Sequence, residues 1–434
     1  SVTPSITITP SRTPSITVSP SKTPSVTRTP SVTPSFTPFP SSTRTPSVTP
    51  SISVSTLISP SPTPTPSVTR TPSLSIPPTY YDYGSDFSEP IEKMIINRHR
   101  LQKKDTTAAV SEAVKPIIYY LDNGTPEPIR SALLEGAGWW NQAFEAAGYK
   151  NAFQVKMLPD SADPMDIRYN MINWVHRSTR GWSYGMTISD PRTGEIIKGQ
   201  VTLGSLRVRQ DYLIFTSLLS PYMNGKPVTD KMRTASLHRL RQLAAHEVGH
   251  TLGLQHNYAS SFNDRASVMD YPHPNIFVNE KGEIDFTKVY TNEIGAWDKR
   301  AIMYGYQEFS KGIDQNVALN KMLEENSKNG LLFIADADAR AASSFHPYAH
   351  LWDNQGDAVA GLQQTLQVRS KALSQFGEDA LKNGTPLTKL EDVLVPLYNY
   401  HRYQLEAVTK LIGGINYNDS VKGCLLYTSD AADE

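Results

Sequence analysis

The segment His246-Glu247-Val248-Gly249-His250 places two imidazoles and a carboxylate at a spacing that can hold a metal ion beside an acid–base group. The surrounding apolar residues predict a helix, in which side chains at i and i+4 lie one turn apart on the same face. Both histidines could therefore ligate one ion at about 2.0–2.1 Å. Glu247 is the neighbour that can reach a water molecule on that ion.

A third histidine follows at short range. Gly253 comes just after the expected helix, where a left-handed residue can reverse the chain, and His256 lies three residues later. Three protein ligands leave the fourth position of a tetrahedral zinc open for water, which distinguishes a catalytic site from a structural one. The spacing therefore predicts a catalytic Zn²⁺ centre.

A methionine in a tight turn follows in Ser267-Val268-Met269-Asp270-Tyr271. The two segments, HEVGHTLGLQH and then SVMDY, together resemble the active site of the zinc peptidases called metzincins. Residues from about Ile91 to Gly423 resemble large bacterial zinc-dependent metalloproteases with flanking domains of unknown function. Three further segments carry this second resemblance: Asp163–Arg177, Arg180–Asp211 and His346–Asp353.

The resemblance implies roles for individual residues. The implied zinc ligands are His246, His250 and His256. Glu247 would be the general base and then the general acid, and Met269 the hydrophobic floor of the site. Tyr271 matches a tyrosine that in some metzincins ligates the resting zinc and then supports the oxyanion. The strand Ser183–Ser189 would bind an extended peptide substrate along its free edge.

Alternating strands and helices are expected to position this site. A strong turn signal at Asp190–Gly194 predicts an antiparallel hairpin between Ser183–Ser189 and Glu195–Leu203. The pattern predicts an α+β fold, a mixed sheet with packed helices, followed by a mostly helical region. The other expected elements are a strand over Ile117–Leu121, a helix opened by Thr125-Pro126 and closed by Gly148, a strand over Phe153–Met157, a strand marked by Ile167, Tyr169 and Met171, and helical stretches over Ala358–Phe376 and Leu387–Leu411.

The first 80 residues differ sharply from the rest. They contain 20 Ser, 19 Thr and 18 of the 32 Pro, with no glycine and no acidic residue. Proline at this density with little to bury predicts an extended, disordered stretch. One interpretation is an O-glycosylated stalk, which would make the protein secreted, periplasmic or cell-surface. The other is an inert linker or a fused segment.

The expected organisation has four parts: residues 1–90 as the disordered stretch, 91–310 as the catalytic domain, 311–423 as a truncated helical region, and 424–434 as a foreign tail. The tail reads CLLYTSDAADE and is similar to one translated frame of a sequencing-library adapter. The single cysteine, Cys424, lies in it, so an internal disulfide and every multi-cysteine zinc site are excluded.

Charge and hydropathy limit the partners. Lys and Arg number 42, as do Asp and Glu, so no bulk charge favours nucleic acid, and no run is long and apolar enough for a transmembrane helix. A peptide or protein substrate is the expected partner. The alternative from another class is a non-catalytic, stalked binding or adhesion module with a metal-stabilised domain.

Two alternatives concern metal ligands. Asn292-Glu293 with Asp298 faintly resembles the segment that supplies the third ligand in gluzincins, although His256 has the tighter spacing and an ordinary helix-start acid is the simpler interpretation. A second metal site could use His273, His346 and His350, but their scatter favours packing or substrate contact.

Overall fold

The computed structural model describes residues 79–417 except 179–180, 224–225, 228, 341–343 and 355. These residues all belong to the second of two units, Pro64–Glu434. The Ser/Thr/Pro-rich sequence up to residue 78 and the tail 424–434 lie outside the described residues, so the predictions for them stay predictions.

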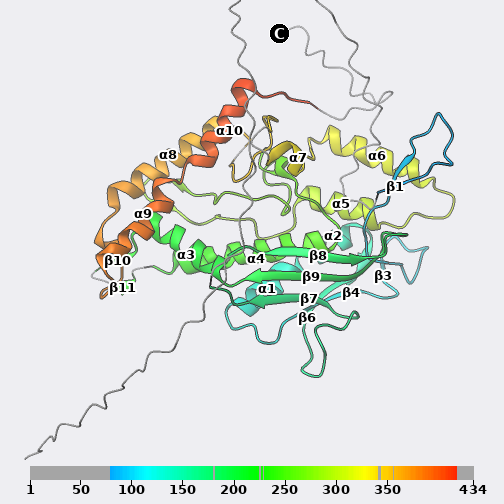
Figure 1. The fold of residues 1–434 in the computed structure, drawn as a ribbon, viewed down its shortest axis with the longest axis horizontal. Helices are drawn as coiled ribbons and strands as arrows, with labels where there is room; N and C mark the ends of the chain where they lie inside the picture. The colour runs from blue at the N-terminus through cyan, green and yellow to red at the C-terminus, as the bar shows by residue number, and fades with distance from the viewer. Residues whose placement is uncertain are drawn as a thin grey trace, which may run out of the picture. The chain divides into compact units, whose positions relative to one another are not determined.

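A five-stranded sheet forms the centre of the structure, with strand order β6-β4-β7-β9-β8 (Figure 1). The first four strands in this order are parallel, and β8 is antiparallel to β9 at the end of the sheet. The predicted hairpin and its edge strand are therefore confirmed. The strands span Ile117–Leu121 (β4), Phe153–Met157 (β6), Asn170–Val175 (β7), Tyr184–Ser189 (β8) and Ile196–Gly204 (β9).

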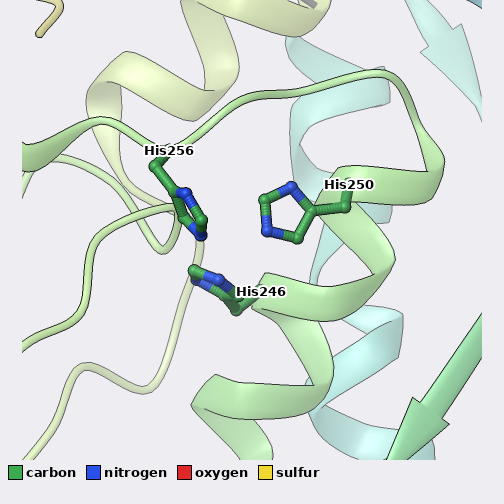
Figure 2. A group of neighbouring side chains, drawn as sticks. All are labelled: His246, His250 and His256. Carbon is green, nitrogen blue, oxygen red and sulfur yellow. The ribbon is translucent and has the colours of Figure 1, made fainter. Parts of the chain in front are cut away.

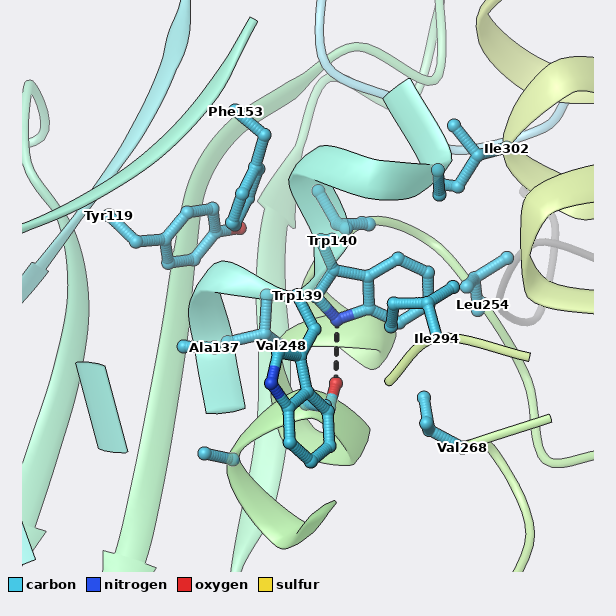
Figure 3. Packing of buried hydrophobic residues seen from close by; sticks show 14 of the residues in the cluster. Tyr119, Ala137, Trp139, Trp140, Phe153, Val248, Leu254, Val268, Ile294 and Ile302 are labelled. Carbon is cyan, nitrogen blue, oxygen red and sulfur yellow. Dashed lines mark hydrogen bonds between the residues drawn. The ribbon is translucent and has the colours of Figure 1, made fainter. Parts of the chain in front are cut away.

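Helices pack on this sheet around a large apolar core. Helix α4 (Lys231–Thr251) crosses α1 (Ile129–Gly138) so closely that a Cβ on Gly136 would lie 2.1 Å from the Arg241 carbonyl oxygen. Trp140, fully buried in α2 (Trp140–Ala146), donates its indole N–H to the Ala245 carbonyl at 2.8 Å (Figure 3). This packing holds α4, which carries the first two histidines, against the core that it shares with the sheet.

The region from residue 296 onward is mostly helical, as predicted, and it packs against the part of the chain that contains the sheet. Helix α3 (Leu206–Leu219) contributes Phe215 and Leu218 to a second core with α8 and α9. The confirmed fold class is α+β. The later helices are α5 (Ala296–Tyr306), α6 (Gln315–Lys328), α7 (Asp336–Ala339), α8 (Ala358–Gln375), α9 (Leu390–Tyr398) and α10 (Arg402–Gly413).

The other strands are short and form two-stranded sheets. They are β1 (Thr79–Tyr81), β2 (Glu92–Met94), β3 (Ser111–Glu112), β5 (Tyr149–Lys150), β10 (Tyr222–Met223), β11 (Lys226–Pro227), β12 (Phe277–Val278) and β13 (Ile284–Asp285). None of the helices in the described residues is long and apolar enough to cross a membrane.

Three predicted elements have different boundaries in the structure. The third strand begins only at Asn170, because Asp163 and Asp166 accept nearby backbone N–H groups and hold the preceding residues in turns. Thr125 does not cap the first helix: its hydroxyl is buried without a hydrogen-bond partner, and α1 starts at Ile129. That expected helix is also divided at Trp139. Similarly, the stretch over Leu387–Leu411 divides into α9 and α10.

Candidate metal centre

Three histidines converge where α4 ends (Figure 2). His246 and His250 lie one turn apart on α4, and their ring centroids are 4.8 Å apart. Gly253 then takes a φ of +98°, a left-handed conformation that reverses the chain and returns His256 to the other two. One ring nitrogen from each histidine can be chosen so that all three lie within 4.8 Å of one another. The predicted trio is thus assembled by the helix and the turn after it.

Each imidazole is oriented through its Nδ1 atom. The Nδ1–H groups of His246 and His250 donate to the backbone carbonyls of Val268 and Leu254, both at 2.8 Å. His256 donates its Nδ1–H to Oδ2 of Asp336 at 2.6 Å. Because carbonyl and carboxylate oxygens only accept, these contacts leave Nε2 of each ring as the free electron-pair donor.

The donor set fits a metal ion. Nε2 of His246 and Nε2 of His256 are buried and have no hydrogen-bond partner. Buried polar atoms are normally satisfied, so two orphaned imidazole nitrogens in one cluster need an electron acceptor between them. Burial and, to a lesser extent, the neighbouring histidines lower the pKa of His246 well below its usual value and the pKa of His250 to about 4. Both rings are therefore neutral at pH 7, the form that ligates a metal.

Glu247 lies on α4 beside His246 and faces β8. Its side chain is almost fully buried, and this burial raises its pKa to about 8, against the opposing effects of the Arg239 cation and a backbone hydrogen bond from Gly185. A Cβ on Gly185 would lie 2.2 Å from the Glu247 carbonyl oxygen and 2.9 Å from Cβ of His250. The edge strand can approach the helix this closely only because residue 185 is glycine.

Met269 lies in the turn under α4. It is fully buried, and a Cβ on Gly249 would be 2.2 Å from its sulfur and 2.7 Å from the Trp140 ring. Two hydrogen bonds of Ser267 stabilise the turn: its Oγ donates to Asp298 at 2.6 Å and accepts the Met269 N–H at 2.9 Å. The methionine therefore packs directly against the helix between the first two histidines.

Tyr271 packs against two of the histidines. Its ring lies 5.1 Å from the His246 ring, nearly parallel, and 4.6 Å from the His256 ring. The Trp352 indole stacks on its other face at 5.6 Å. Burial raises the pKa of Tyr271 to about 12, and the nearby Glu247 contributes in the same direction. The phenol is therefore protonated at neutral pH and able to donate a hydrogen bond.

The structure supports neither of the two other candidate ligand sets, the gluzincin-like segment with Glu293 and the second group of histidines. Glu293 is exposed and does not join the histidine cluster. Within the described ranges, His246, His250 and His256 form the one group arranged for a metal. The three histidines of the second candidate set pack separately: His273 against the Tyr400 ring, His346 with its Nε2 near the Tyr417 carbonyl, and His350 at 3.5 Å from Glu406.

Several residues of the site were missed from the sequence. Asp336 and Trp352 come from the region after residue 310, and Arg239 is a buried cation two turns before His246 on α4. Arg239 follows the period of the buried face of α4, which could have indicated its burial. Neither Asp336 nor Trp352 carries a local signal, because their roles arise from contacts distant in sequence.

Comparison with known proteins is consistent with this geometry. Residues 229–425 match the model of a family described as Met-zincin. The matched segment contains the three histidines, the Met269 turn and the region that supplies Asp336 and Trp352. No curated protein and no solved structure matches the chain.

Proposed function

We propose that this chain is a metzincin-type zinc metalloprotease that hydrolyses peptide bonds in protein substrates. The match of residues 229–425 to the Met-zincin family model and the histidine cluster support this proposal. The observation that carries the proposal is the histidine trio beside a buried glutamate, with Nε2 of His246 and Nε2 of His256 buried and without a hydrogen-bond partner. His246, His250 and His256 would hold Zn²⁺, whose preferred set of three nitrogen ligands and one open position this arrangement matches.

A bound Zn²⁺ would polarise the scissile carbonyl and lower the pKa of a water molecule toward about 7. Glu247 would accept a proton from that water and later return it to the leaving amine. A neighbouring dication favours the ionised carboxylate, which offsets the effect of burial on Glu247. The Gly185 N–H hydrogen bond would keep the carboxylate oriented toward the reacting groups.

Tyr271 would donate a hydrogen bond to the oxyanion that develops on the scissile carbonyl. Its protonated phenol and its packing between His246 and Trp352 support this assignment. Met269 would form the apolar floor that fixes the helix under the ligands.

Strand β8 would bind the substrate as an added antiparallel strand. It is at the end of the sheet, and its Gly185 touches the helix at Glu247. Tyr184, Met186 and Ile188 have exposed side chains along one face of the strand. A peptide paired with this edge would pass beside the metal centre and gain affinity from backbone hydrogen bonds with little sequence information.

A cleavage assay tests the proposal. The purified full chain loaded with Zn²⁺ should degrade an unstructured protein such as casein. Degradation should stop when a chelator removes the metal and resume when Zn²⁺ is restored. A zinc-loaded, folded chain that leaves casein and peptide libraries intact would instead favour the binding or adhesion module.

A secreted, periplasmic or cell-surface location is also part of this proposal.

A further inference from the structure

One of the three histidines is oriented by a charged side chain and not by the backbone. Asp336 Oδ2 accepts the Nδ1–H of His256 at 2.6 Å, whereas His246 and His250 donate to carbonyl oxygens. A carboxylate on the far nitrogen of an imidazole makes the near nitrogen a stronger electron donor than a neutral carbonyl does. His256 is therefore the histidine whose orientation and strength as a ligand depend on another side chain.

The second carboxylate oxygen of Asp336 is also held. Oδ1 accepts from Arg340 Nη1 at 3.0 Å, one helical turn later on the same chain segment, and from the Tyr258 hydroxyl at 3.2 Å. With both oxygens occupied, the carboxylate has a fixed orientation toward His256. Arg340 also stabilises the ionised form, which is the form that can only accept hydrogen bonds.

The backbone holds this arrangement in register. The side chain of Asn257 donates to the Leu332 carbonyl at 2.9 Å and accepts the Ile334 N–H at 3.2 Å. The Tyr258 N–H donates to the Ile334 carbonyl at 2.9 Å. The segment that immediately precedes Asp336 is thus hydrogen-bonded to the residues that immediately follow His256. These backbone contacts, together with its own hydrogen bonds, fix the position of the Asp336 carboxylate.

We infer that Asp336 is a positioning residue for the metal ligand His256, fixing its ring and tautomer and strengthening Nε2 as a donor. The segment after residue 310 therefore completes the metal centre and is not an accessory to it. The inference rests on the proposed function only in requiring that the histidine trio binds a metal.

Zinc affinity tests the inference without any peptide substrate. We would compare the full chain with its Asp336→Asn variant by competition with a zinc-binding dye at pH 7.5. Asp336→Asn should weaken zinc binding about 10- to 100-fold, the usual effect of removing such a partner. The control, Asp379→Asn, makes the same chemical change at an exposed site and should bind zinc as the parent does.

Two measurements separate positioning from simple misfolding. The metal-free Asp336→Asn variant should melt within a few degrees of the parent, and its Co²⁺ complex should show a shifted d–d absorption band. Arg340→Gln leaves the Asp336 contact to His256 in place and the Tyr258 hydrogen bond to Oδ1 intact, but it removes the charged donor to Oδ1. It should give a smaller loss of affinity in the same direction. Zinc binding by Asp336→Asn equal to that of the parent would overturn the inference. A chain that binds zinc with the predicted Asp336 dependence but cleaves nothing would contradict only the proposed function.

Discussion

Asp298 accepts the backbone N–H of Val268 at 2.8 Å, and the carbonyl of the same Val268 accepts the Nδ1–H of His246 at 2.8 Å. A fully buried carboxylate on α5 thus orients a metal-site histidine through the backbone of one residue, Val268. Asp298 also accepts from Ser267 Oγ and from the Gly295 N–H. In the sequence, Asp298 belonged to the segment that faintly resembles the third-ligand segment of gluzincins. In the structure, it supports the turn under the site instead.

Replacing Asp298 with alanine should destabilise the fold and the site together. The change leaves three donors without their buried acceptor, and each such donor costs roughly 1–3 kcal/mol. We expect the free energy of unfolding to fall by about 3 kcal/mol or more, measured by denaturant titration. Glu324→Ala, at an exposed position of α6, is the control and should stay within about 0.5 kcal/mol of the parent. Parental stability of Asp298→Ala would show that this network is not a support.

The same carboxyl predicts a pH dependence of stability. Burial raises the pKa of Asp298 to about 7, despite hydrogen bonds from Ser267, Val268 and Gly295 that lower it. Because its pKa is higher in the folded than in the unfolded chain, protonation favours folding. This contribution is complete below about pH 4 and is lost as the pH rises to about 7.

The test compares the parent with Asp298→Asn. The stability of the parent relative to the variant should decrease as the pH rises from 5 to 8, by at most about 1.4 kcal/mol per unit. Other buried groups titrate equally in both proteins, so they cancel in this difference. A constant difference in stability across this pH range would contradict the assignment.

Gly185→Ala should impair catalysis more than folding. The added methyl group would meet the Glu247 carbonyl at 2.2 Å, so β8 must move away from α4. We expect kcat/KM for casein-derived peptides to fall about 100-fold, the effect of displacing a reacting group by about 1 Å. Gly138→Ala is the matched control, because a Cβ there meets nothing within 4 Å. Equal activity of both variants would show that the close approach of β8 is unnecessary.

Tyr271→Phe should separate catalysis from metal binding. The phenyl ring retains the packing against His246 and Trp352 but loses the hydrogen-bond donor. Zinc content should stay at the parental level while kcat falls about 100-fold with little change in KM. Tyr83→Phe, at an exposed position, serves as control. An unchanged kcat would remove Tyr271 from the catalytic residues.

The parts of the site that are local in sequence were predictable. Helical periodicity places His246 and His250 on one face, and the left-handed Gly253 explains the return of His256. The hairpin of β8 and β9 followed from its turn signal. Periodicity and turn chemistry act over a few residues, and here no long-range contact overrides them.

The supporting residues could not be predicted in the same way. Asp336 is 80 residues from His256, and Asp298 is 30 residues from Val268. No periodic pattern connects them, because each pair is brought together by tertiary packing. The start of β7 was missed for a different reason: the side chains of Asp163 and Asp166 compete with the sheet for backbone N–H groups.

The central claim is that Glu247 performs proton transfer at a zinc centre held by the three histidines. Glu247→Gln keeps the size and hydrogen-bonding shape of the side chain and removes its basicity. The most direct test measures zinc content and casein cleavage for the full chain and this variant side by side. The account predicts one equivalent of zinc in both proteins and cleavage by the parent alone, with the variant reduced by at least about 1,000-fold. Cleavage by the variant at the parental rate would contradict it.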